Sequence, residues 1–143
     1  YGVSLTADAS WFGKMETMRR GHQALLEAMP PGHVDFLRSL PFSLTFGDFF
    51  FCHAGIRPGI PLDKQNPQDL IWIRDVFHDH TGLFPKIVVH GHTPVPEAEV
   101  MANRVNVDTL AWQSGMLSAL VVDGPDKRIL TITIKEAGTT KGA

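Results

Sequence analysis

Two short apolar runs, each leading into a histidine, constrain the fold more than any other feature of this sequence. Residues 49–52 read Phe-Phe-Phe-Cys and are followed by His53, and residues 86–89 read Lys-Ile-Val-Val and lead into His-Gly-His at 90–92. Short apolar runs beside glycine are typical of strands buried on both faces. The sequence therefore predicts a layered sheet with histidines just beyond the ends of two strands.

The patterns along the rest of the chain predict helices first and strands afterwards. The predicted helices span residues 15–29, 33–40 and 69–77, with Pro-Pro-Gly at 30–32 separating the first two. The predicted strands span residues 42–46, 49–52, 86–89, 104–107, 116–122 and 128–134. A Gly-Asp pair at 47–48 joins the first two strands as a hairpin, and the Gly- and Pro-rich stretch 54–66 is expected to be a loop.

This order of elements favours an α+β or layered α/β fold. We expect one domain, or a large part of one, over residues 1–135, followed by a flexible tail at 136–143 that has no periodicity. The chain begins at Tyr1 as though in mid-course, which suggests a fragment of a longer protein.

Composition excludes several classes of function. With 43% hydrophobic and 20% charged residues, the chain has an ordinary globular composition. The formal net charge of -2 leaves no basic excess for nucleic-acid binding. No stretch is apolar enough to span a membrane, and no secretory segment opens the chain, so a cytoplasmic location is expected. The single cysteine, Cys52, lies in an apolar run and is expected to be a buried, inert thiol.

The histidines at the strand ends are candidate metal ligands. Open α/β folds place ligand sites where strands end and loops begin, and imidazole suits zinc, manganese or iron. The competing interpretation is that each histidine is a hydrogen-bonded structural residue. We expect His92 to be a ligand and His90 to be a supporting group.

Four motifs in order then point to a family. They are Phe-Phe-Phe-Cys-His-Ala-Gly-Ile-Arg-Pro-Gly, Asp-Leu-Ile-Trp-Ile-Arg-Asp, Val-Val-His-Gly-His-Thr-Pro-Val and Arg-Val-Asn-Val-Asp-Thr. Over residues 22–122 the chain resembles the bacterial Ser/Thr phosphoprotein phosphatases of the calcineurin-like metallophosphoesterase superfamily. This resemblance implies part of a β-sandwich flanked by helices, with the N-terminal half missing.

The resemblance also implies a site. His53 and His92 would bind the same one of two divalent metal ions, with manganese expected and iron or zinc open. Arg74 would be the catalytic arginine that clamps the phosphate, as its planar, permanently charged fork allows. The competing interpretation of Arg74 is a surface ion pair with Asp69 or Asp75. Arg57 is a second candidate for an anion contact.

Two further residues matter to the resemblance. Asp108 falls in a segment where we expect a structural role that holds a loop. Where such proteins commonly continue with Gly-Ala-Tyr, this chain has Leu-Ala-Trp, which leaves open whether Trp112 lines the rim of the site or only packs.

Three motifs of the family are missing: Gly-Asp-x-His-Gly, Gly-Asp-x-x-Asp-Arg-Gly and Gly-Asn-His-Glu occur nowhere in this sequence. They would carry the ligands of the other metal, the bridging aspartate, an asparagine ligand, another arginine and the general-acid histidine. The chain alone is therefore expected to be inactive and to bind metal weakly, as part of a phosphoesterase that hydrolyses phosphomonoesters with a metal-bridging hydroxide.

The nature of the substrate stays open. A phosphorylated protein is the first expectation, and a small phosphoester such as a dinucleoside polyphosphate is the alternative. A third interpretation is an inactive structural or binding segment in which both histidines are structural.

Overall fold

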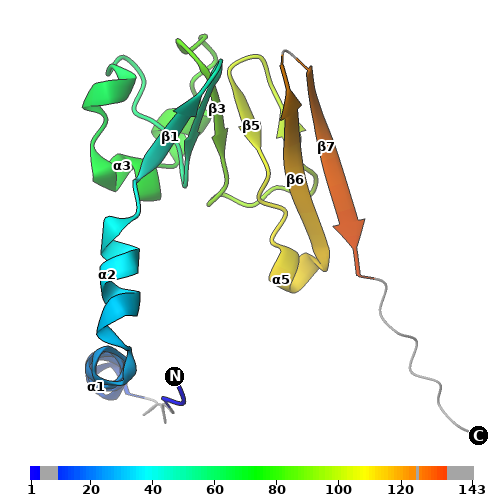
Figure 1. The fold of residues 1–143 in the computed structure, drawn as a ribbon. Helices are drawn as coiled ribbons and strands as arrows, with labels where there is room; N and C mark the ends of the chain where they lie inside the picture. Colours follow the sequence, from blue (N-terminus) through cyan, green and yellow to red (C-terminus); the bar gives the residue numbers. More distant parts are fainter. Residues whose placement is uncertain (4–9, 125, 135–143) are drawn as a thin grey trace, which may run out of the picture. The chain divides into compact units, whose positions relative to one another are not determined.

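The computed structural model describes residues 1–3, 10–124 and 126–134 and divides into two units, Tyr1–Pro41 and Phe42–Ala143 (Figure 1). The described part of the first unit is helical, and the second unit contains all the strands of the described residues, together with His53 and His92. The expected flexible tail at 136–143 lies outside the described residues. Among the described residues, none of the helices combines the length and the apolar character needed to cross a membrane.

The helical unit begins with α1 (Trp11–Ala28), whose N-terminus is capped by the Ser10 hydroxyl, which accepts a hydrogen bond from the Gly13 amide at 3.0 Å. Helix α2 (Pro31–Ser39) has a proline in its first turn, where no amide hydrogen is needed. Both predicted helices are present, although α1 starts four residues earlier than the apolar spacing indicates. Several apolar side chains of α1 are exposed, including Met18 at 67%.

The second unit is built on a five-stranded mixed sheet of order β1-β2-β3-β5-β4 (Figure 1). Its central strands β2, β3 and β5 are parallel, and the edge strands β1 and β4 run antiparallel to their neighbours. The strands are β1 (Ser43–Phe46), β2 (Phe49–Cys52), β3 (Ile87–His90), β4 (Glu99–Val100) and β5 (Arg104–Asn106). The short edge strand β4 was not predicted, because a two-residue strand carries no periodicity.

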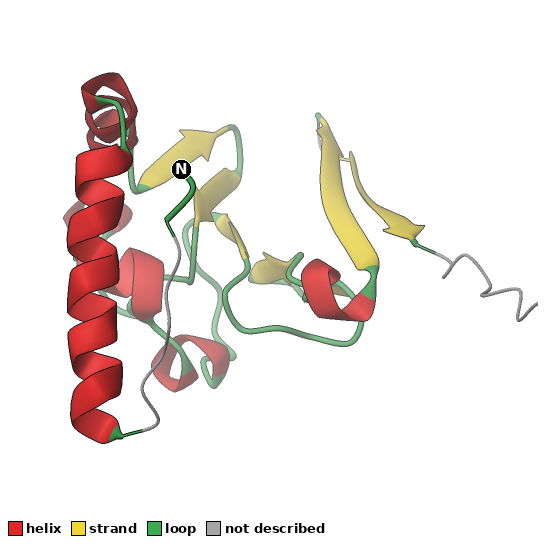
Figure 2. Ribbon diagram, turned by 90° about the horizontal axis from the view of Figure 1, so that it is seen from below, coloured by secondary structure: helices red, strands yellow, loops and turns green. Residues whose placement is uncertain are grey.

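Alternating residues of the central strands face two different apolar layers. Phe50 and Val88 pack in a cluster with Leu70, Ile73 and Phe77, which lie on or beside helices α3 (Pro67–Trp72) and α4 (Asp75–His78). The opposite face, formed by Phe49, Val89 and Val105, packs against Leu120, Val122 and Ile129 of the β6–β7 ladder. The strands are therefore buried on both faces, as their continuous apolar runs predict. Within the second unit, Figure 2 shows α3 and α4 on one side of the five-stranded sheet and the β6–β7 ladder on the other.

The β6–β7 ladder pairs β6 (Met116–Asp123) with β7 (Asp126–Thr133) in antiparallel register, so Leu120 lies opposite Ile129. A short helix, α5 (Ala111–Ser114), precedes it, and a 3-10 helix (Leu62–Lys64) lies within the expected loop 54–66. Neither was predicted, because a single turn of helix is too short to show the helical spacing of apolar residues.

The predicted helix at 69–77 is corrected to two helices with a break at Ile73 and Arg74. Ile73 is extended and closes α3 by donating to the Asp69 carbonyl at 3.0 Å. Arg74 has φ -132° and ψ -108°, which no α-helix accommodates. The break allows Ile73 to enter the apolar cluster while Arg74 is exposed.

Candidate functional site

The carboxyl ends of β2 and β3 bring the two candidate ligands together. These strands are parallel neighbours with Phe51 opposite Val89, so His53 and Gly91 extend them side by side. The Gly91 amide donates to the His53 carbonyl at 2.9 Å and continues the ladder by one more bond. His92 follows immediately, beyond the carboxyl ends of the parallel strands, where α/β folds commonly bind ligands.

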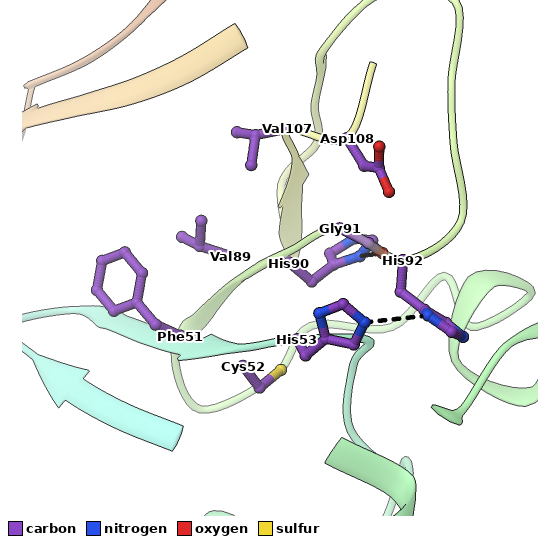
Figure 3. Close-up of a pocket in the computed structure, with 9 residues that line it drawn as sticks. All are labelled: Phe51, Cys52, His53, Val89, His90, Gly91, His92, Val107 and Asp108. Atoms are coloured by element: carbon purple, nitrogen blue, oxygen red, sulfur yellow. Dashed lines mark hydrogen bonds between the residues drawn. The ribbon is translucent and has the colours of Figure 1, made fainter. Parts of the chain in front are cut away.

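The imidazole rings of His53 and His92 are in direct contact. His53 Nε2 lies 3.1 Å from His92 Nδ1, and the ring centroids are 4.9 Å apart (Figure 3). Two nitrogens bound to one ion at about 2.0–2.1 Å are separated by roughly 2.8–3.4 Å when the angle between the bonds is about 90–110°. The observed separation therefore fits a shared ion as well as it fits a hydrogen bond between the rings.

The electrostatic surroundings favour a neutral imidazole at position 92. Burial, followed by the nearby positive charges of Arg74 and His53, lowers the pKa of His92 below its usual value. A metal ligand must offer an unprotonated nitrogen, so this shift favours metal binding. The Nε2 atom of His92 is buried and has no hydrogen-bond partner among the described residues.

The donor set around this pair is incomplete. Among residues 1–3, 10–124 and 126–134, no group of three or more His, Cys, Asp or Glu side chains could hold a metal ion. First-row divalent ions take four or more donors. The separation of the His53 and His92 nitrogens fits two ligands of one ion, and the described His, Cys, Asp and Glu side chains supply no third ligand beside them.

Arg74 reaches the same turn from the break between α3 and α4. Its Nη1 donates to the Thr93 hydroxyl at 3.3 Å, and it forms no ion pair with Asp69 or Asp75 in the described structure. Exposed and held by one long hydrogen bond, the guanidinium keeps most of its donors available for an anion.

Arg57 is already occupied by a neighbouring carboxylate. Its Nε and Nη2 atoms each donate to a carboxylate oxygen of Asp69 at 2.8 Å. The bidentate pair ties the loop after β2 to α3, which is a structural function. Asp69 therefore pairs with Arg57, and Arg74 is left as the stronger candidate for binding an anion.

Several polar groups behind the histidines are structural. Asp108 accepts a hydrogen bond from the Leu110 amide at 3.0 Å, and its carbonyl accepts from Val95 at 2.9 Å, so the predicted loop-holding role is confirmed. His90 is 2% exposed, and burial lowers its pKa to about 4. It packs edge-on against Phe77 with ring centroids 4.8 Å apart, as expected of a supporting residue.

The site opens as a cleft of about 380 Å³ at the carboxyl ends of the central strands (Figure 3). Its lining comes from the ends of β2, β3 and β5: Phe51, Cys52, His53, Val89, His90, Gly91, His92, Val107 and Asp108. Trp112 is 83% exposed and does not line this cleft.

One aromatic side chain beside the histidines was missed from the sequence. Trp72, the last residue of α3, contacts the His92 ring edge-to-face with centroids 5.3 Å apart and is itself 59% exposed. Its spacing in Asp-Leu-Ile-Trp-Ile-Arg suits a core residue equally well. Its position two residues before Arg74 was the only available signal.

Comparison with solved structures identifies a protein of similar fold. The chain is similar to a crystal structure described as that of "a putative diadenosine tetraphosphatase", with a TM-score of 0.60 and 19% sequence identity. The match covers 82% of this chain and 60% of the other, so the chain spans about 60% of the length of that protein. No protein-family model matches the sequence, and no curated protein does so. At this identity the likeness establishes a shared fold.

Proposed function

We propose that this chain carries part of the active site of a metal-dependent phosphoesterase, with His53 and His92 as two ligands of one ion. The observation that carries the proposal is the 3.1 Å approach of His53 Nε2 to His92 Nδ1 at the ends of adjacent parallel strands. The four ordered motifs resembling calcineurin-like phosphoesterases and the fold of the solved neighbour support it. Two divalent ions, with manganese first and iron or zinc as alternatives, are part of the proposal.

The bound ions would supply Lewis acidity and a hydroxide nucleophile at neutral pH. The chain's own residues then have distinct tasks. His53 and His92 would each donate a nitrogen lone pair, and the lowered pKa of His92 keeps its ring neutral for this purpose. Arg74 would bind phosphoryl oxygens and stabilise the negative charge that builds on them during hydrolysis.

The two candidate substrate classes are supported by different observations. The sequence motifs favour a phosphoserine or phosphothreonine side chain of a protein. The exposed Trp72 ring beside His92 favours a nucleotide instead, because an indole can stack on a base. The description of the solved neighbour also favours a dinucleoside polyphosphate.

The first experiment is an assay of the complete gene product with p-nitrophenyl phosphate and Mn²⁺. We expect His53→Ala and His92→Ala to abolish turnover, and Arg74→Ala to weaken it by on the order of 2–4 kcal/mol. Arg57→Ala is the matched control, since its guanidinium is bound by Asp69. Unchanged turnover in Arg74→Ala, with a loss in Arg57→Ala, would reverse the assignment.

The second experiment separates the two substrate classes. We expect Trp72→Ala to lower kcat/KM for diadenosine tetraphosphate by about 5- to 150-fold while sparing a phosphopeptide, because one base–aromatic stack contributes roughly 1–3 kcal/mol. Equal losses on both substrates would assign Trp72 to supporting His92 and remove the argument for a nucleotide.

A third measurement concerns the 143-residue chain by itself. Because no group of three or more His, Cys, Asp or Glu side chains among its described residues could hold a metal ion, the chain is expected to show no metal-dependent turnover and to bind Mn²⁺ weakly. Robust turnover that His53→Ala abolishes would show that the other ligands are supplied from within this chain.

A further inference from the structure

The backbone at His92 adopts a conformation that histidine rarely takes. Its φ is 67°, in the left-handed region where a side chain clashes with its own backbone. Such a conformation costs of order 1–3 kcal/mol and persists only where neighbouring contacts impose it. Something in the structure must therefore hold this residue.

The Asn106 side chain provides that restraint. Its Nδ2 donates to the Thr93 carbonyl at 2.9 Å, and its Oδ1 accepts from the Asp108 amide at 3.0 Å. Asn106 is 1% exposed and lies opposite His90 in the β3–β5 ladder. An amide buried this deeply has no water to replace a lost partner, so its hydrogen bonds are strongly directing.

The bonds on either side of His92 complete the restraint. The Thr93 amide donates to the Gly91 carbonyl at 2.8 Å across His92, while Asn106 holds the Thr93 carbonyl. The chain direction before and after His92 is thus fixed, and the ring is turned toward His53. The Thr93 hydroxyl also accepts a hydrogen bond from Arg74, so the same turn holds the arginine that is proposed to bind phosphate.

We propose that Asn106 is a positioning residue that holds the turn at His92 and thereby aims its imidazole at His53. The effect on metal binding rests on the proposed function, whereas the effect on ring geometry does not. Asn106 acts through the backbone, because its side-chain amide bonds the Thr93 carbonyl and the Asp108 amide. Residues that orient metal ligands typically change metal affinity by about 10–100-fold when they are replaced.

The chain offers a matched control in Asn103. It is also a buried asparagine in the same stretch, 5% exposed, and it donates to the His80 and Gly82 carbonyls at 3.2 and 2.9 Å. Asn103→Ala removes the same kind of hydrogen bonds from a loop that does not contain His92. A general loss of stability should affect both variants alike.

The test compares Asn106→Ala with Asn103→Ala by NMR of the histidine rings. In metal-free wild-type protein we expect nuclear Overhauser effects between the His53 and His92 rings. Asn106→Ala should lose them and weaken Zn²⁺ binding at these rings by about 10–100-fold. Asn103→Ala should retain them and change Zn²⁺ binding by less than about threefold.

Three outcomes would overturn the proposal: a folded Asn106→Ala variant that keeps the ring contacts, equal losses in both variants, or a wild-type protein without the contacts. If Asn106→Ala does not fold, Asn106→Asp and Asn103→Asp at pH 8 decide by the same criteria. An unfolded Asn106→Asp beside a folded Asn103→Asp would assign Asn106 to general stability and overturn it too. If the wild-type protein shows contacts between the His53 and His92 rings but binds no Zn²⁺, the proposed metal site is wrong and the positioning role of Asn106 is unaffected.

Discussion

The two turns that carry the candidate ligands are held in different ways. After β2, Ala54 is fully buried and donates to the Leu70 carbonyl at 2.8 Å, and Gly55 lies against the buried Phe77 ring. After β3, the turn at His92 is held by Asn106 and by a left-handed backbone. Burial against an aromatic ring and backbone hydrogen bonds hold the first turn, whereas the side-chain amide of Asn106 holds the second. The two halves of the candidate site therefore depend on different kinds of contact.

The largest expected effect concerns the thiol that immediately precedes the first turn. Burial raises the pKa of Cys52 to about 12, so the thiolate is scarce at pH 8. Relative to an ordinary thiol with a pKa of about 8.5, the thiolate fraction falls by roughly three orders of magnitude. Iodoacetamide should therefore label native Cys52 about a thousandfold more slowly than urea-unfolded protein, as measured by mass spectrometry. Similar rates would mean that the packing of this turn is loose.

The next effect tests the packed turn itself. A Cβ on Gly55 would overlap the Phe77 ring, and φ is 149°, so Gly55→Ala should destabilise the fold by about 3 kcal/mol or more. Urea denaturation measures the loss. The added cost of Gly55→Ala should shrink in a Phe77→Ala background, because the ring that it meets is gone. A cost that is unchanged in that background would locate the strain in the backbone alone.

The smaller effect belongs to the hydrogen-bonded turn. A Cβ on Gly91 would lie 3.1 Å from the Asp108 Cβ, a contact that a slight shift relieves, and its φ is not in the left-handed region. Gly91→Ala should cost only about 1–2 kcal/mol of stability but should displace His92. The Zn²⁺ affinity of Gly91→Ala should therefore be clearly lower than that of the wild type, although urea denaturation should show that the variant is still folded. A variant that loses stability and keeps full Zn²⁺ binding would contradict the comparison.

The same contrast explains what the sequence could predict. Continuous apolar runs predict buried strands, so the positions of β2 and β3, and of the histidines at their carboxyl ends, were predicted correctly. The break at Arg74 depends on Ile73 entering the core, which is a tertiary effect that helical spacing cannot reveal.

Hydrogen-bonded features were also hidden. Asn106 appears in the sequence as one polar residue in a short strand, and nothing local shows that its amide reaches Thr93, 13 residues earlier. The pairing of Arg57 with Asp69 likewise joins residues 12 apart whose partnership depends on the fold. Sequence patterns identified the side chains that could bind a metal or an anion, and the fold determines which of them lie in contact.

The most direct measurement of the central claim is a crystal structure of the protein grown with Zn²⁺ or Mn²⁺ and recorded at the metal's absorption edge. The account predicts an anomalous-difference peak for a metal ion that lies about 2.0–2.2 Å from both His53 Nε2 and His92 Nδ1, and it predicts that this peak is absent in His92→Ala. A metal bound elsewhere, with the two imidazoles still hydrogen-bonded to each other at saturating metal, would contradict it.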